Sequence, residues 1–76
     1  MNEKRRQRLR PIATKLREII GTIQLFLDAE QDAFYGLPES IQESARGDDF
    51  TERIDHLADA IDLIDQAADH IDEAAS

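Results

Sequence analysis

The sequence has no cysteine and no tryptophan, and it contains only two prolines and three glycines in 76 residues. Without cysteine, the chain forms neither disulfides nor thiolate metal sites, and the reducing cytoplasm is the simplest setting for it. No apolar run approaches the roughly 18 residues that a membrane-spanning helix needs. A chain of this length has room for one domain, and its scarce helix breakers favour helices. We therefore expect a single all-α domain with no membrane segment.

Negative charge predominates, but it is unevenly distributed. The net charge is −8, composed of +5 in residues 1–20, −6 in residues 21–50 and −7 in residues 51–76. An acidic body argues against nonspecific nucleic-acid binding by the whole chain. The basic start remains open to three interpretations: it contacts phosphates, it occupies an acidic groove of a protein, or it is simply solvated. Its arginines are Arg5, Arg6, Arg8 and Arg10.

The first long segment has apolar residues at alternating steps of three and four. This heptad spacing predicts a helical seam made of Leu9, Ile12, Leu16, Ile19, Ile23, Phe26, Glu30 and Ala33. A flanking set widens the apolar face beyond that of a two-stranded coiled coil: Ala13, Ile20, Leu27 and Phe34. We expect a helix over about residues 4–35 that ends at a left-handed Gly36. Pro11 either begins its regular part or lies in a kinked interior, and we favour a helix that extends upstream of it.

A short connector helix and a second long helix are expected next. Pro38 and the capping-box spacing of Ser40 and Glu43 predict a short helix over about residues 38–46, closed by Gly47. Asp48 or Asp49 would cap a helix over about residues 49–75. Its heptad seam comprises Phe50, Ile54, Leu57, Ile61, Ile64, Ala68, Ile71 and Ala75, flanked by Ala60, Ala67 and Ala74.

Two long helices joined by a short connector predict an antiparallel hairpin. Charge supports this arrangement, because it brings the cations Lys15 and Arg17 near the acidic end of the second helix. The anions expected there are Asp69, Asp72 and Glu73. A hairpin buries only one side of each helix, so we expect a homodimer that forms a four-helix bundle. The candidate dimer interface consists of Ile20, Leu27 and Leu63.

An acidic stripe follows the outer face of the second long helix. Its members are Asp55, Asp59, Asp62, Asp69 and Glu73. Regular negative charge on a rigid helix can imitate a phosphate backbone and occupy a basic groove, which makes the stripe a candidate partner-binding surface. The alternative is that an outer face is charged for solubility alone. Aspartate is a poorer helix former than glutamate, so helix propensity does not explain its repeated use here.

The connector concentrates polar and aromatic residues at one end of the hairpin. Its candidate partner-binding residues are Tyr35, Ser40, Gln42, Ser44 and Arg46. Two helix starts with a nearby arginine are suited to an anionic small ligand. The alternative is an end cap in which Tyr35, Leu37 and Ile41 close the core.

Catalytic and metal-binding patterns are missing from the sequence. His56 with Asp59 and His70 with Glu73 have the i, i+3 spacing of some metal ligands, but both histidines lie on the flank of the heptad and we expect them to be solvated. No nucleophile and base pair and no glycine-rich phosphate loop occur. We therefore expect no enzyme activity, no metal and no cofactor.

An arginine-rich start and a heptad helix precede the connector sequence Leu37-Pro38-Glu39-Ser40-Ile41-Gln42-x-Ser44-x-Arg46-Gly47, which an Ile/Ala/Asp heptad helix follows. Over nearly its whole length, the chain resembles a group of small uncharacterised helical-hairpin proteins carried by bacterial phages, prophages and mobile elements. The resemblance implies no enzyme and suggests an accessory or counter-defence role.

The sequence thus favours a non-catalytic, dimeric interaction protein that binds and modulates a host or phage macromolecule. Three alternatives remain at this point. The chain is an acidic nucleic-acid mimic that blocks a basic partner, it sequesters an anionic small ligand at the connector, or it is a purely structural assembly protein.

Overall fold

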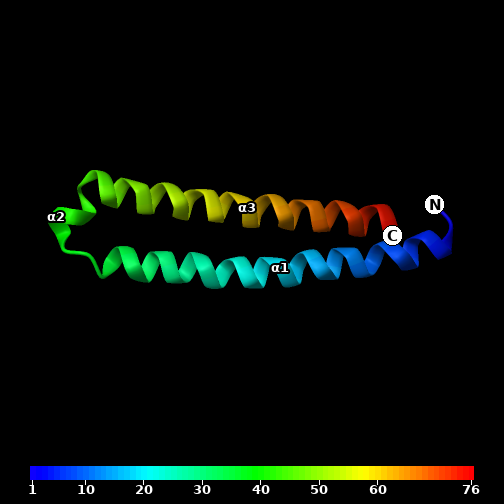
Figure 1. Cartoon of the computed structure of the whole chain (residues 1–76). Helices are drawn as coiled ribbons and strands as arrows, with labels where there is room; N and C mark the ends of the chain where they lie inside the picture. The colour runs from blue at the N-terminus through cyan, green and yellow to red at the C-terminus, as the bar shows by residue number, and fades with distance from the viewer.

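The structure, a computed structural model, describes residues 1–76 and contains three helices. They are α1 (Glu3–Tyr35), α2 (Glu39–Gln42) and α3 (Ala45–Ala75). The long helices α1 and α3 run antiparallel, with α2 at the far end of the molecule (Figure 1). The resulting rod measures 58 × 15 × 11 Å. This arrangement confirms the predicted all-helical hairpin.

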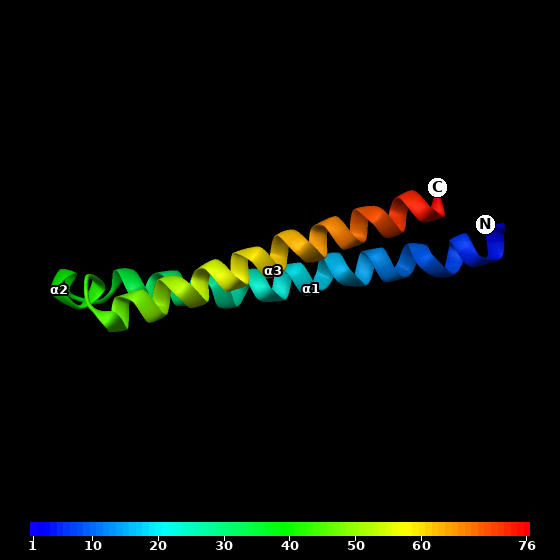
Figure 2. The same ribbon diagram turned by 90° about the horizontal axis from the view of Figure 1, so that it is seen from above.

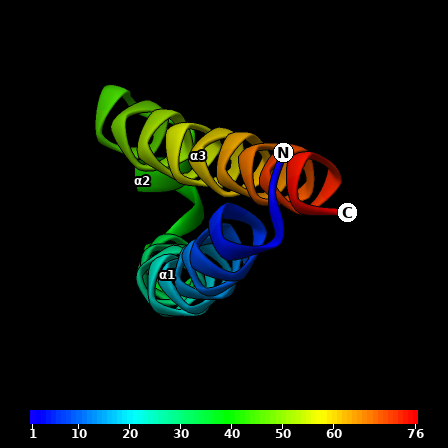
Figure 3. The same cartoon turned by 90° about the vertical axis from the view of Figure 1, so that its right-hand side faces the viewer.

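The two long helices form the whole body of the molecule. Viewed from above, they cross at a shallow angle along their length (Figure 2). Viewed along the rod, they lie side by side with α2 behind them, and no further helix covers either side of the pair (Figure 3). None of the helices combines the length and apolar character needed to cross a membrane.

Helix α1 begins upstream of Pro11. Asn2 is its N-cap, and the Asn2 side-chain oxygen accepts a hydrogen bond from the backbone N–H of Arg5 at 2.9 Å. Glu3 places an acidic side chain in the first turn, where it interacts favourably with the helix dipole. Pro11 lies inside the helix on an exposed position. Because Pro11 has no N–H, exposure lets water satisfy the carbonyl that the proline leaves unpaired.

The seam of α1 differs from the predicted one. The buried and half-buried residues at heptad spacing combine the flanking set with every second residue of the expected seam. They are Leu9, Ala13, Leu16, Ile20, Ile23, Leu27, Glu30 and Phe34. The expected seam positions Ile12, Ile19, Phe26 and Ala33 are exposed. The two patterns share every second residue, so the sequence alone did not separate them. The hairpin itself selects one pattern by packing Phe34 against Phe50, with ring centroids 6.4 Å apart.

The seam of α3 agrees with the prediction. All eight positions from Phe50 to Ala75 are buried or half-buried, and Ala68 and Ala75 are the most completely covered of them. Alanine at the seam permits close approach of the helices. Of the flanking alanines, Ala67 and Ala74 are exposed and Ala60 is half-buried.

The connector is built differently from the predicted one. Helix α2 spans only Glu39–Gln42, with Pro38 at its N-cap, instead of residues 38–46. Helix α3 starts at Ala45, so its N-cap is Ser44 and neither Asp48 nor Asp49. The expected left-handed Gly36 is also wrong, because its φ of −75° and ψ of −12° are right-handed.

Gly47 allows the end of α2 to lie against the start of α3. The glycine is buried inside the first turn of α3, and a Cβ at this position would lie 1.8 Å from the carbonyl oxygen of Gln42. Only a residue without a side chain allows the end of α2 to lie this close to the start of α3. Gly47 is therefore a close-approach position inside a helix, where the sequence had suggested a helix stop.

The hairpin alone does not complete a hydrophobic core. It exposes 5541 Å² of surface, whereas a compact protein of this mass exposes about 4,700 Å². No large side chain is fully buried. Two helices in contact leave most of each apolar face partly in water.

Two glycine substitutions test the connector packing. Replacing Gly47 with alanine should lower the free energy of unfolding by about 2 kcal/mol, because the new Cβ must displace backbone. Gly21 has nothing within 4 Å of its Cβ position, so Gly21→Ala should raise the same free energy by roughly 0.5 to 1 kcal/mol through helix propensity. Urea unfolding at one protein concentration measures both changes, and a Gly47→Ala variant as stable as the parent would contradict the packing.

Candidate functional site

One side of the hairpin is held by ion pairs. The guanidinium of Arg17 in α1 lies 2.6 Å from the carboxylate of Asp72 and 3.1 Å from that of Asp69, both in α3. These hydrogen bonds, led by the one to Asp72, raise the pKa of Arg17 above its ordinary value. An arginine is charged at physiological pH in any environment, so both contacts are charge-assisted hydrogen bonds. The predicted approach of Arg17 to Asp69 and Asp72 is confirmed, whereas neither Lys15 nor Glu73 forms an ion pair.

The basic start of α1 is also partly engaged within the chain. Arg10 donates to the backbone oxygen of Ala75 at 3.3 Å, so it satisfies a carbonyl at the C-terminal end of α3. The same side chain lies 3.5 Å from Glu3, which also contacts Arg6 at 3.7 Å. A cation at a helix C-terminus interacts favourably with the helix dipole. Of the four arginines considered for phosphate contact, Arg5 and Arg8 form no ion pair.

The opposite side of the hairpin is apolar and exposed. Side chains two positions apart on a helix point about 200° apart, so Ile19 lies on the other side of α1 from Arg17. Ile19 is 48% exposed, and its neighbours at seven-residue intervals, Ile12 and Phe26, are 45% and 64% exposed. These three side chains recur at two-turn intervals on one side of α1, with the exposed Lys15 and Thr22 between them. Exposed large apolar residues that recur on one side of a helix are typical of an interaction surface.

Helix α3 contributes small residues and one leucine to the same side. Phe26 lines a groove with Glu30 of α1 and with three residues of α3, Arg53, His56 and Leu57. Seven-residue steps from Arg53 lead to Ala60, Ala67 and Ala74, and one such step from His56 leads to Leu63, which is 65% exposed. We call this surface the open side and define it by Ile12, Ile19, Phe26, Ala60, Leu63, Ala67 and Ala74.

The exposed residues differ in part from the predicted dimer interface. Leu27 is only 7% exposed and Ile20 is half-buried, because both lie in the seam against α3. Neither is available to a second chain in the way the sequence had suggested. Leu63 does lie on exposed surface, as that prediction required. The correction follows directly from the shift of the α1 seam by one residue.

The acidic stripe is divided by the hairpin contacts. Asp69 is committed to Arg17, whereas Asp55, Asp59 and Asp62 are exposed and form no ion pair. Glu73, near the end of α3, is also exposed and unpaired, so the unpaired part of the stripe comprises three aspartates in the middle of the helix and this glutamate. Three exposed carboxylates without an ion pair thus lie together in the middle of α3.

The connector residues serve mainly to close the end of the hairpin. The side-chain amide of Gln42 donates to the backbone oxygen of Leu37 at 2.9 Å, and the hydroxyl of Ser44 donates to that of Ile41 at 2.5 Å. Tyr35 is 74% exposed and packs edge-on against Phe34 with ring centroids 5.4 Å apart. Tyr35 therefore does not close the core, whereas Leu37 and Ile41 are half-buried. Ser40 and Arg46 are exposed and make no side-chain hydrogen bond.

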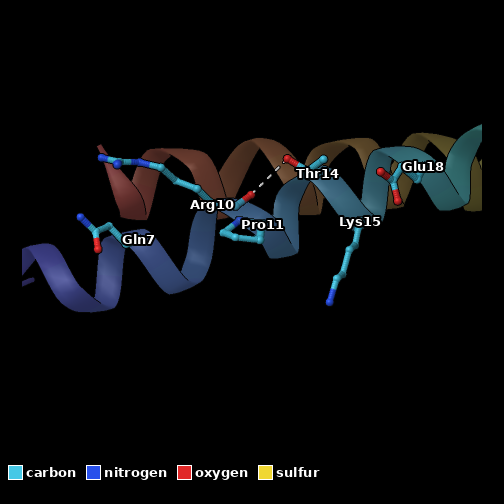
Figure 4. Close-up of a pocket in the computed structure, with 6 residues that line it drawn as sticks. All are labelled: Gln7, Arg10, Pro11, Thr14, Lys15 and Glu18. Atoms are coloured by element: carbon cyan, nitrogen blue, oxygen red, sulfur yellow. Dashed lines mark hydrogen bonds between the residues drawn. The ribbon is translucent and has the colours of Figure 1, made fainter.

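Neither surface groove of the molecule includes a connector residue. One is the groove beside Phe26, and the other lies entirely on α1 around Pro11 (Figure 4). It is lined by Gln7, Arg10, Pro11, Thr14, Lys15 and Glu18. The Thr14 hydroxyl donates to the Arg10 carbonyl oxygen at 3.4 Å within this groove. Since a single helix forms this groove, it has no opposing wall to enclose a ligand.

The histidines lie apart from any cluster of ligands. His56 is 3.9 Å from Glu52 on the same helix, and both side chains are largely exposed. No group of three or more histidine, cysteine, aspartate or glutamate side chains is placed to hold a metal ion.

Sequence reasoning missed the role of Arg53. Its guanidinium lies 4.5 Å from the centroid of the Phe50 ring and 3.2 Å from the carboxylate of Glu30. The contact with the Phe50 ring lies within α3 and positions the guanidinium, and the ion pair with Glu30 ties α3 to α1 near the connector. The available signal was Glu30, an acidic residue at a seam position, which requires a cation close by.

Comparison with known proteins adds no relative: no family model, no curated protein and no solved structure matches the chain.

The ion pairs of Arg17 lead to a prediction. Arg17→Gln should lower the melting temperature at low ionic strength, because it removes both contacts to α3. The loss should largely disappear near 1 M salt, where the Debye length is about 3 Å. Lys15→Gln is the matched control, since Lys15 lacks an ion pair and should change little at either salt concentration. Equal effects of the two substitutions in melting experiments would contradict the assignment.

Proposed function

We propose that this chain is a non-catalytic interaction protein that works as a homodimeric four-helix bundle and binds a macromolecular partner through the surfaces left outside. The observation that carries the proposal is the difference between the two sides of the hairpin. One side carries the ion pairs of Arg17, whereas the open side presents Ile12, Ile19 and Phe26 to water. A second copy of the chain is present in any solution of the protein and can cover the open side.

The exposed area supports a dimer of ordinary size. The hairpin exposes 5541 Å², which is roughly 800 Å² more than a compact protein of its mass. A standard protein interface buries about 800 Å² on each partner. Pairing through the open side would therefore bring each chain close to the surface area of a compact domain.

The setting we propose is the bacterial cytoplasm, in an accessory or counter-defence role on behalf of a phage or mobile element. The support for this setting is the resemblance of the connector and its flanking heptad helices to small helical hairpins of such elements. A dimeric bundle is suited to this role because it presents the same outer surface twice, which increases avidity for a repetitive or dimeric target.

A second candidate function is that of an acidic nucleic-acid mimic that blocks a basic partner. It is favoured by Asp55, Asp59 and Asp62, which are exposed and free of ion pairs. Steps of three and four residues place one such charge at about every 5 Å along the helix, compared with about 3.4 Å per phosphate along one DNA strand. Pairing through the open side leaves these carboxylates accessible on both copies.

Neighbouring residues provide a matched test of the dimer. Phe26 and Leu25 are similarly exposed, at 64% and 69%, but Leu25 lies off the open side. Phe26→Glu should raise the dissociation constant of the dimer at least about tenfold, because a buried unpaired carboxylate costs more than 1.4 kcal/mol. Leu25→Glu should leave it nearly unchanged. Size-exclusion chromatography over a dilution series distinguishes the two, and equal behaviour would contradict the proposed interface.

Charge reversal tests the mimic. The triple variant Asp55→Lys, Asp59→Lys, Asp62→Lys should lose basic proteins that the parent captures from bacterial lysate, and duplex DNA should displace those proteins from the parent. The control reverses Glu18, Asp28 and Asp32, three exposed acids on α1, and so changes the net charge equally. If the α3 variant still captures the basic proteins, or if duplex DNA does not displace them from the parent, mimicry is ruled out. The proposed dimer is unaffected by either result.

A further inference from the structure

We propose that the two copies pack through their open sides with their connectors at the same end of the bundle, so that α1 of each copy lies against α3 of the other. The inference rests on the proposed dimer and adds its orientation. The occupant of the open side is a second copy of this chain, and the twofold axis runs along the rod.

The heights of the side chains along the rod come from three contacts between α1 and α3: Arg10 with Ala75, Arg17 with Asp69, and Phe34 with Phe50. Because the helices are antiparallel, these contacts place Ile19 within about two residues, or about 3 Å, of the height of Ala67. Heptad steps in opposite directions then bring Ile12 level with Ala74, and Phe26 level with Ala60. Each level of the open side therefore pairs one large side chain from α1 with one alanine from α3.

The orientation of the two copies follows from this pairing of large side chains with alanines. If the axis runs along the rod, every large residue of one copy meets the alanine at the same height on the other. Each layer then holds two large and two small side chains on opposite diagonals, which gives even layers, as close packing requires. An axis across the rod would instead stack α1 on α1 and α3 on α3. Large side chains would then fill one half of the interface and alanines the other, which splays the helices at one edge.

Leu63 supports the same choice. In the heptad count it lies at the height between Ile19 and Phe26, and it is 65% exposed. With the axis along the rod, Leu63 of one copy packs between Ile19 and Phe26 of the second copy. With the axis across the rod, Leu63 faces the other α3, near His70, and remains poorly covered.

Spin labels on single cysteines test the orientation, and the absence of natural cysteine makes each label unique. Ser40→Cys labels the connector and Gln7→Cys labels the opposite end, both at exposed positions. The proposed dimer should give distances within about 30 Å for both labels, the width of two packed hairpins. An axis across the rod at the height of Ile19 should separate the Ser40 labels by at least about 48 Å and the Gln7 labels by at least about 36 Å.

A label at exposed Glu18, near the middle of the rod, is the control. It should give a short distance in either orientation, so it reports dimerisation alone. Short distances at all three positions support the proposal. A short distance at Glu18 with long distances at Ser40 and Gln7 overturns the orientation but leaves the dimer standing. No dipolar coupling at Glu18 at high protein concentration overturns both.

Discussion

The packing of α1 against α3 along a seven-residue seam is the constraint on which the rest of the structure depends. Two straight rows of side chains, one from each helix, meet along the rod, and α2 only joins their ends. A pair of helices has one contact face, so small residues such as Ala13 and Ala68 are fully covered while the larger seam residues stay partly in water. The contact between α1 and α3 therefore has two different edges. The ion pairs of Arg17 stabilise one edge of the contact, and the other edge exposes Ile12, Ile19 and Phe26, with an ion pair only near the connector, between Arg53 and Glu30.

The sequence predicted the architecture because two signals agreed. Heptad periodicity indicated two long helices, and the contrast between a basic start and an acidic end indicated that they run antiparallel, which Arg17 and Asp69 confirm. The connector was harder to predict. Glycine commonly marks the end of a helix, but Gly47 lies inside α3. The residue there is glycine because the carbonyl of Gln42 occupies the space that a side chain would need. Such a contact is tertiary, and no local pattern reports it.

The candidate surfaces were predictable only in part. An apolar stripe wider than a two-stranded seam correctly indicated leftover hydrophobic surface, but periodicity could not decide which half of the stripe faces α3. Leu27 and Phe26 are adjacent in the chain, and the hairpin buries the first and exposes the second. That choice is made by the register between the helices. For the same reason, the unpaired aspartates could be separated from Asp69 only once the position of Arg17 was known.

The molar mass of the unmodified chain in solution tests the central claim most directly. Sedimentation equilibrium over a range of micromolar to millimolar concentrations should give twice the 8.6 kDa mass of one chain, with dissociation only on dilution. That result would show that a second copy binds, which coverage of the open side requires. A mass of one chain at every concentration would contradict the account, because the hairpin would then be stable with Ile12, Ile19, Phe26 and Leu63 in water.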